Sequence, residues 1–364
     1  MRLDRVLRFV VMAFAVGAFA GLVGGLAFGG APDAGTPKAA TQTSEAPSTA
    51  SESSATTSGP REPMTPARAQ AIGANELGQV LVVMYHLIDA EEGEWTRTPE
   101  NFRKDLELLK QEGFYPVNVR DLAAGNIDIP AGKSPVVITF DDSSIGQYHI
   151  LEDGSLDPNC AVAIMQAEVE AGGWASRASF FPLIDVDVAS REIFGQPDLK
   201  REKLRNLVEW GYEVGSHTVT HLNLKKASKT EAVKQLAQSK AILEELIGGG
   251  YSVTSLAVPF GEYPDSDDIL ARGEYNGITY AYTAALSVVP ELCPSPFSTK
   301  FRPFHIPRIR GSDDYIRQAT NTFKKNPGLR YISDGDPTTV SAPLALDPAL
   351  GDVRTDLGRP VIRY

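Results

Sequence analysis

The chain has 364 residues, a formal net charge of −11 and only two cysteines. Its length leaves room for one large domain of about 250 residues with appendages, or for two smaller domains. The acidic balance argues against nucleic acid as a partner, because phosphate binding requires clustered Lys and Arg side chains. A neutral substrate fits this charge better.

The first 31 residues predict a targeting or anchoring segment. Three arginines precede an uncharged stretch over residues 9–31, which is long enough to span a bilayer with its short N-terminal end in the cytoplasm. We expect residues 1–31 to be an uncleaved signal-anchor or a removed signal peptide, and the length favours the anchor. The rest of the chain is therefore expected to be exported, either anchored on the outer face of the cell membrane or secreted.

The next segment has the composition of a tether. Residues 32–71 are rich in Ala, Ser, Thr and Pro and almost lack large apolar side chains, which predicts a disordered linker. We expect the folded domain at residues 72–326 and a C-terminal extension at residues 327–364, to which the sequence assigns no function.

The two cysteines leave two alternatives. In an oxidising exterior, Cys160 and Cys293 could form one disulfide that closes a long loop. Both could equally be unpaired and buried. We favour the disulfide, and neither residue lies where a nucleophile or a metal ligand would be useful.

From residue 79 onward, apolar segments typical of strands alternate with amphipathic segments typical of helices. The expected strands cover residues 79–86, 115–119, 134–140, 178–183, 212–215, 251–258, 278–284 and 304–309. The expected helices cover residues 99–111, 159–171, 200–210, 229–247 and 312–325. This alternation predicts an α/β fold with a mainly parallel sheet, and we expect it to close into a distorted (β/α) barrel of about seven strands. An open doubly wound sheet is the alternative, although no glycine-rich phosphate loop follows the strands.

Two histidines and two aspartates form the main candidate site. His217 and His221 are four residues apart, so both rings can face one point if the segment is helical. Asp141 and Asp142 follow an apolar strand, and Asp142 would complete a His, His, Asp set suited to a catalytic zinc. Taken separately, the histidines also fit two packed rings at a helix start, and the aspartates fit a helix cap or a turn. Taken together, they favour a metal centre.

Three short motifs resemble a known family. Residues 139–142, 215–221 and 258–261 resemble, in that order, the first three motifs of the polysaccharide deacetylases of carbohydrate esterase family 4. The likeness extends over about residues 79–310 and leaves out the tether and the tail. It implies a distorted (β/α) barrel that removes acetyl groups from N-acetylglucosamine-containing polysaccharide, either peptidoglycan or an exopolysaccharide.

The resemblance also assigns roles to individual residues. It implies one divalent metal, Zn²⁺ or a similar ion, on Asp142, His217 and His221. It further implies that Asp141 is the general base for a metal-activated water, and that the backbone N–H of Phe260 stabilises the oxyanion. The implied partner is an N-acetylated glycan, with the membrane as a second partner through the N-terminal segment.

The chain departs from the family pattern at three places. Ala257 or its neighbour stands where an arginine usually opens the third motif, Ser143 stands where glycine is common, and the late Leu-x-His is not evident. Members that begin with a Tyr-His strand suggest that His86 replaces the late histidine as general acid and that Arg308 pairs with Asp141. The alternatives are a packed histidine and an arginine paired with another acid. A glycan-binding protein with a degraded site and a metal-dependent hydrolase of another amide are the competing functions.

Overall fold

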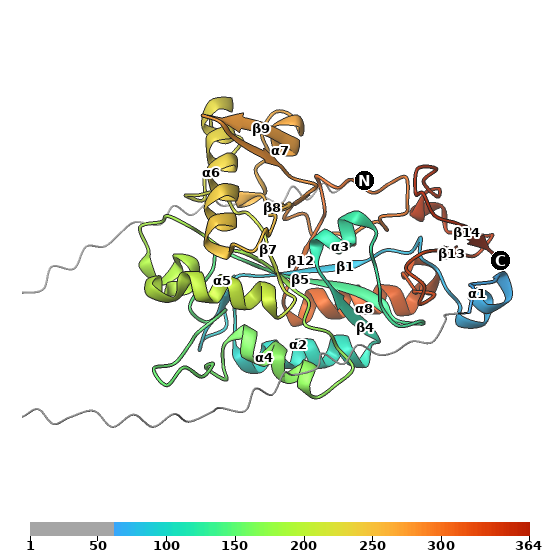
Figure 1. Ribbon diagram of the computed structural model, residues 1–364. Helices are drawn as coiled ribbons and strands as arrows, with labels where there is room; N and C mark the ends of the chain where they lie inside the picture. The colour runs from blue at the N-terminus through green and yellow to red at the C-terminus, as the bar shows by residue number, and fades with distance from the viewer. Residues whose placement is uncertain (1–61) are drawn as a thin grey trace, which may run out of the picture. The chain divides into compact units, whose positions relative to one another are not determined.

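The computed structural model describes residues 62–364, which are coloured in Figure 1. The expected membrane span and most of the expected linker lie outside this part of the chain. No helix within residues 62–364 is both long enough and apolar enough to cross a membrane. Helix α1 (Pro66–Ile72) begins inside the segment expected to be linker, and the Thr65 hydroxyl caps it by accepting from the Arg68 N–H at 3.2 Å. Ordered structure therefore begins before residue 72, the expected start of the folded domain.

The main sheet has six strands, and all of its pairings are parallel. Its strand order is β12-β1-β5-β6-β7, and β4 also pairs with β5. These strands are β1 (Leu81–Tyr85), β4 (Phe114–Val117), β5 (Ser134–Asp141), β6 (Ser179–Phe181), β7 (Glu213–Val214) and β12 (Ile309–Arg310). Strand β5 is buried along its whole length, as a central parallel strand covered on both faces should be.

The seven-stranded barrel is not shown as a closed structure. Strands β8 (Ser255–Ala257) and β11 (Ala284–Leu286) form a separate parallel pair. Two isolated parallel bridges, Ser216–Leu256 and Leu286–Ile306, connect this pair to chain segments beside β7 and β12. The mixed α/β fold with a parallel sheet is thus confirmed, whereas a closed barrel is not shown, because only single bridges join the two groups of strands.

One expected barrel strand is divided between two other elements. Residues 278–284 contain β10 (Ile278–Ala281), which pairs antiparallel with β9 (Arg272–Tyr275), and they end where β11 begins. Asn276 and Gly277 form the connecting turn with φ angles of 50° and 82°. An Asn-Gly turn with both φ angles positive is a strong hairpin signal. The expected single strand over these residues is therefore wrong.

The expected helices are present with boundaries shifted by a few residues. The helices after α1 are α2 (Pro99–Gln111), α3 (Val119–Ala124), α4 (Ala161–Glu170), α5 (Lys200–Glu209), α6 (Lys229–Ile247), α7 (Asp268–Ala271) and α8 (Asp313–Lys325). The hydroxyls of Thr98 and Ser228 cap α2 and α6 by accepting backbone N–H groups, each at 3.2 Å. In Figure 1, α2, α4, α5 and α8 lie together on one side of the sheet.

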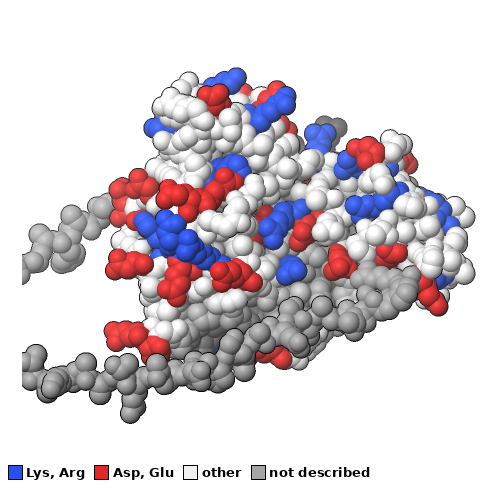
Figure 2. All heavy atoms as spheres, viewed as in Figure 1, with Lys and Arg blue, Asp and Glu red and all other residues white. Residues whose placement is uncertain are grey.

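Charged side chains on the helices pair with their neighbours. Lys104 reaches Glu100 one turn earlier on α2 at 2.6 Å, and Lys110 joins α2 to Glu168 of α4 at 3.0 Å. Acidic and basic side chains are interspersed on the face drawn in Figure 2. Exposed pairs of this kind contribute at most about 1 kcal/mol each, so the fold depends mainly on its core.

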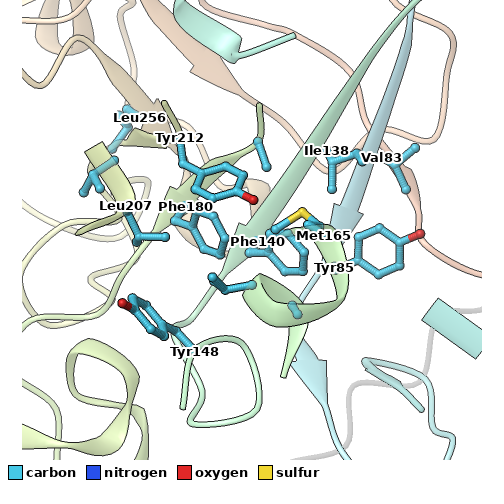
Figure 3. Close-up of a cluster of buried hydrophobic side chains, with 14 of the residues drawn as sticks. Val83, Tyr85, Ile138, Phe140, Tyr148, Met165, Phe180, Leu207, Tyr212 and Leu256 are labelled. Atoms are coloured by element: carbon cyan, nitrogen blue, oxygen red, sulfur yellow. The ribbon is translucent and has the colours of Figure 1, made fainter. Parts of the chain in front are cut away.

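A row of aromatic rings crosses the core on the helix-covered face of the sheet. Tyr85, Phe140 and Phe180 stand opposite one another on β1, β5 and β6, with ring centroids 5.6 Å and 4.8 Å apart (Figure 3). Successive side chains of a strand point to opposite faces. Because Phe140 faces this core, the next residue, Asp141, faces the other side of the sheet, where the candidate site lies.

The C-terminal extension is an ordered part of the domain. Strands β13 (Val340–Ala342) and β14 (Val361–Arg363) pair with each other, and the Tyr364 hydroxyl donates to the Ala74 carbonyl oxygen at 2.8 Å. The buried carboxylate of Glu76 accepts the Ser341 N–H at 2.8 Å. The tail is thus fixed to the residues that lead into β1.

Cys160 and Cys293 do not form the favoured disulfide. Both thiols are free and buried. Cys160 precedes α4 in the core that contains the aromatic row, whereas Cys293 belongs to a second hydrophobic cluster with Val80 and Val82. The two cysteines therefore lie in separate parts of the core.

Candidate metal centre and active site

Asp142, His217 and His221 come together although about 75 residues separate the aspartate from the histidines. Asp142 Oδ1 lies 3.3 Å from His217 Nε2 and 3.4 Å from His221 Nε2, and one ligand atom from each residue lies within 4.8 Å of the others. His217 Nδ1 contacts the Ala257 carbonyl oxygen at 2.7 Å, which orients Nε2 toward Asp142. The structure thus brings together all three side chains that the sequence suggested as metal ligands.

The histidine segment is not helical, so the geometric reason given for the pairing is wrong. Residues 217–223 form an irregular loop in which Thr218 and His221 have φ angles of 63° and 56°. Gln235 of α6 supports this loop, since its Oε1 accepts the N–H groups of Val219 and Thr220 at 2.9 and 3.1 Å. No pattern in the sequence around Gln235 predicted this support.

Strained backbone is concentrated at the site. Eight non-glycine residues within residues 62–364 have positive φ angles, and five of them belong to the site: Asp142, Ser143, Thr218, His221 and Phe260. Such conformations cost roughly 1–3 kcal/mol each and persist only where the surroundings enforce them. At Asp142 the φ of 69° ends the extended strand, so its carboxylate does not continue the alternation set by Asp141.

The residues fit a divalent metal on their own chemistry. Asp142 Oδ1 is buried and lies between two imidazole nitrogens, at 3.3 and 3.4 Å. Burial alone would raise the pKa of Asp142, but His217, His86 and His221 together lower it far below its usual range. Burial and the charge of His217 lower the pKa of His221 to about 4. An ionised carboxylate and a neutral imidazole are the states in which these groups bind a metal.

His217 differs from its partner. Burial disfavours its charged form, but the hydrogen bond to Asp142 and the nearby Asp141 raise its pKa above the ordinary value. A metal must displace a proton from a histidine that is protonated at the working pH. Metal binding at this site should therefore weaken as the pH falls.

Asp141 and Arg308 form a buried ion pair beside the triad. Arg308 donates from Nη1 to Asp141 Oδ1 at 2.8 Å and from Nη2 to Oδ2 at 2.7 Å, and both side chains are almost fully buried. Burial alone would raise the pKa of Asp141, but Arg308 and His217 outweigh it and lower the pKa below its usual value. Arg308 precedes β12 instead of ending the last strand as expected, and its Nε donates to the Ser287 carbonyl oxygen at 2.8 Å.

His86 directly follows β1 and lies at the same end of the sheet as the aspartates. Gln147 Nε2 donates to the carbonyl oxygens of both His86 and Asp141, each at 2.6 Å, and so links the ends of β1 and β5. Burial lowers the pKa of His86, although Asp141 and Asp142 oppose this shift. The imidazole packs against the Trp95 ring, with the centroids 4.7 Å apart.

Phe260 forms the turn after β8. Its φ is 60°, and the turn is closed by the Gly261 N–H, which donates to the Val258 carbonyl oxygen at 2.9 Å. The Phe260 side chain is 57% exposed, and its ring lies 4.3 Å from that of His221. The strained turn thus brings the Phe260 ring next to a candidate metal ligand.

Arg191 is a residue of the site that the sequence did not suggest. Its guanidinium donates to Asp142 Oδ2, which leaves Oδ1 facing the two histidines. The Ser143 hydroxyl donates to the Arg191 carbonyl oxygen at 2.6 Å and accepts the Leu183 N–H at 3.0 Å. Ser143 stands where glycine is common in the family. Its hydroxyl holds the loop that carries Arg191, so this departure from the pattern was the only sequence feature that pointed to the contact.

A cavity of about 730 Å³ borders the site. Arg191 and Ser144 contribute polar groups to its wall, and Leu87, Ile88 and Ile145 contribute apolar ones. Within residues 62–364, Arg191 is the one side chain that both lines this cavity and contacts Asp142, and none of the three candidate metal ligands lines it.

Comparison with known proteins supports the resemblance. Residues 128–281 match the sequence model of the polysaccharide deacetylase family. The protein YxkH of Bacillus subtilis (strain 168), which is provisionally named a polysaccharide deacetylase, is 21% identical over 207 residues. Those residues are 56% of this chain and 63% of YxkH, so the chain spans less than two thirds of that relative.

One solved structure gives a similar fold. IcaB from Ammonifex degensii superposes with a TM-score of 0.50 at 19% identity, over 67% of this chain and 96% of IcaB. A polysaccharide deacetylase from Bacillus cereus gives a TM-score of 0.49 at 22% identity, over 66% of this chain and 68% of that chain. At these identities the likeness concerns the fold alone, so the activity is argued from the site.

Proposed function

We propose that the protein is an exported, metal-dependent hydrolase that removes N-acetyl groups from N-acetylglucosamine-containing polysaccharide, either peptidoglycan or an exopolysaccharide. One observation carries the proposal: the Asp142, His217 and His221 set lies beside the buried Asp141–Arg308 pair in a domain that matches the deacetylase family. The proposed location is the outer face of the cell membrane or the exterior, on the grounds of residues 9–31.

The proposed chemistry gives each side chain one task. Asp142, His217 and His221 would hold a divalent ion such as Zn²⁺, which as a Lewis acid polarises the amide carbonyl and lowers the pKa of a water molecule. Asp141, kept ionised by Arg308, accepts a proton from the attacking water. The backbone N–H of Phe260 donates to the developing oxyanion.

The last task falls to a proton donor. When water adds to the acetamide and the C–N bond breaks, the products are acetate and a free amine, and the amine nitrogen must gain a proton as it departs. His86 lies next to both aspartates and would supply that proton. Together these residues account for hydrolysis of the acetamide: Asp141 takes a proton from the water, and His86 gives a proton to the amine.

The proposal is tested by metal analysis and amine release. We expect the purified full chain to bind about one equivalent of Zn²⁺ and to release amines from N-acetylglucosamine oligomers. A chelator should abolish that release, and added Zn²⁺ should restore it, because the ion carries the Lewis acid chemistry. Bound metal without release from any N-acetylated glycan would contradict the proposal in favour of a glycan-binding protein or a hydrolase of another amide.

Replacing His86 by glutamine is expected to leave metal binding intact and to lower kcat by about 10²–10⁴, the usual contribution of a general acid. The wild-type kcat should fall as the pH rises through the pKa of His86, which burial places below 6.5. This fall in kcat at high pH should be absent from the variant. Measurement of kcat from pH 4 to 9 for both proteins tests the prediction.

The matched control is His305→Gln. His305 pairs with Asp267 at 2.9 Å and has no role in the proposed reaction, so this variant should keep the wild-type profile. Wild-type turnover by His86→Gln would exclude His86 as the acid.

A further inference from the structure

Two exposed aromatic side chains contact histidines of the proposed reaction centre. Eight large hydrophobic side chains are exposed within residues 62–364, and Trp95 and Phe260 are the two aromatic ones among them. The Trp95 ring contacts His86, and the Phe260 ring contacts His221. Exposed apolar groups beside a candidate site are typical of a binding surface.

Trp95 is the largest side chain of this group, and it is held on two sides. Its ring packs against His86, and the Arg310 guanidinium lies 5.2 Å from the ring centroid. Arg310 also donates to the backbone and the side chain of Glu94, both at 3.1 Å. Despite these contacts, 45% of Trp95 remains exposed.

The loop that carries Trp95 is fixed by buried charge. Arg97 is almost fully buried and contacts the carboxylates of Glu92, Asp105 and Asp313 at 2.5–2.6 Å. Ordering a loop and burying an arginine both cost free energy. Here they hold an indole partly in solvent, where its exposed surface is available to a partner.

The surroundings of Trp95 suggest the nature of that partner. The Leu87 N–H donates to the Trp95 carbonyl oxygen at 3.0 Å, and Leu87 also lines the cavity of about 730 Å³ beside Arg191. Phe260 presents a second exposed ring, which lies against His221. His86 follows β1 and His221 follows β7, and β5 with Asp141 lies between these strands in the sheet order. The two rings therefore flank the candidate reaction centre.

We propose that Trp95 is a carbohydrate-binding residue that stacks on an N-acetylglucosamine ring next to the sugar being deacetylated. A pyranose ring has an apolar face of C–H groups and a polar rim of hydroxyls. A half-exposed indole matches this face, and the polar side chains of Glu94 and Arg310 beside the indole match the rim. The inference rests on the proposed function and adds that the substrate is a chain of several sugars, with Trp95 binding a unit that does not react.

The kinetic test compares Trp95→Ala, Trp95→Phe and Leu344→Ala on N-acetylglucosamine hexamer. Trp95→Ala should raise KM about tenfold, the loss expected for one stacked aromatic ring, while kcat stays within about twofold. Trp95→Phe should recover most of the loss, because it keeps an aromatic face. Leu344→Ala removes an exposed apolar side chain far along the chain from the site and should match the wild type.

A binding test separates this proposal from the proposed activity. In Asp141→Asn, which lacks the proposed base, addition of the hexamer should change the tryptophan fluorescence, and the change should vanish when Trp95 is also replaced by Phe. Wild-type KM in Trp95→Ala would overturn the stacking role and leave the deacetylase proposal standing. A Trp95-dependent fluorescence change in a protein that releases no amine would overturn the activity and retain the binding site.

Discussion

Replacing His217 by alanine is expected to abolish stoichiometric metal binding and to lower amine release by a factor of about 10³ or more. The loss of a single outer-sphere partner typically costs metal sites about 10–100-fold in affinity or activity, and His217 would be a direct ligand. The variant also leaves the buried Asp142 carboxylate with one imidazole in place of two. Metal content by mass spectrometry and amine release from N-acetylglucosamine oligomers measure the two losses.

The same variant has a pH signature in the metal-free protein. Because the pKa of His217 is raised in the folded state, its contribution to stability is fully present below the unfolded pKa of about 6.5. That contribution is lost as the pH rises through the folded pKa, and it should be absent from His217→Ala. His305→Ala, which removes a histidine outside the site, serves as the control. Normal zinc content in His217→Ala would rule out the proposed ligand set.

Replacing Arg308 by methionine is expected to destabilise the fold by about 3–5 kcal/mol, because it leaves the Asp141 carboxylate buried without its cation. In the wild type, the lowered pKa of Asp141 contributes stability above the unfolded pKa of about 3.9, and this is lost as the pH falls through the folded pKa. In the variant, burial dominates and raises the pKa, so stability should improve on acidification. Urea unfolding between pH 4 and 8 measures both effects.

A double-mutant cycle with Asp141→Asn isolates the pair. The double variant should lose less stability than the sum of the two single variants, since neither member then leaves an unpaired buried charge. Lys104→Met removes the cation of an exposed pair on α2 and should change stability little. Additive losses in the cycle would mean that Arg308 stabilises the fold through Ser287 and Thr139 rather than through Asp141.

Local signals in the sequence located most helices and the central strands. The caps at Thr98 and Ser228 and the apolar run of β5 depend on neighbouring residues alone, so they could be recognised without the fold. The same holds for the order of the motifs that carry Asp142 and the two histidines. The prediction that Asp142 and the two histidines form one site, however, required the resemblance to a family and the expectation that the carboxyl ends of parallel strands lie together.

Features set by long-range contacts were missed. The loop of His217 and His221 is shaped by Gln235, a residue on another helix with no distinguishing pattern around it. Arg191 reaches Asp142 from a loop almost 50 residues away, and nothing near Arg191 in the sequence indicates the contact. The error at residues 278–284 had another cause. The Asn276–Gly277 turn predicted a hairpin from local sequence, but the apolar pattern of residues 278–284 was interpreted as a single barrel strand.

The left-handed residues around the metal centre also bear on efforts to make this protein more robust. Glycine at Ser143 or Thr218 would relieve a backbone conformation that side chains disfavour, so selection for heat resistance alone should be drawn to these positions. Each such exchange would also release a hydroxyl that fixes a loop, at Arg191 in the first case and at Leu222 in the second. Glycine substitutions that stabilise the fold at these turns would therefore loosen the loops that position the catalytic side chains.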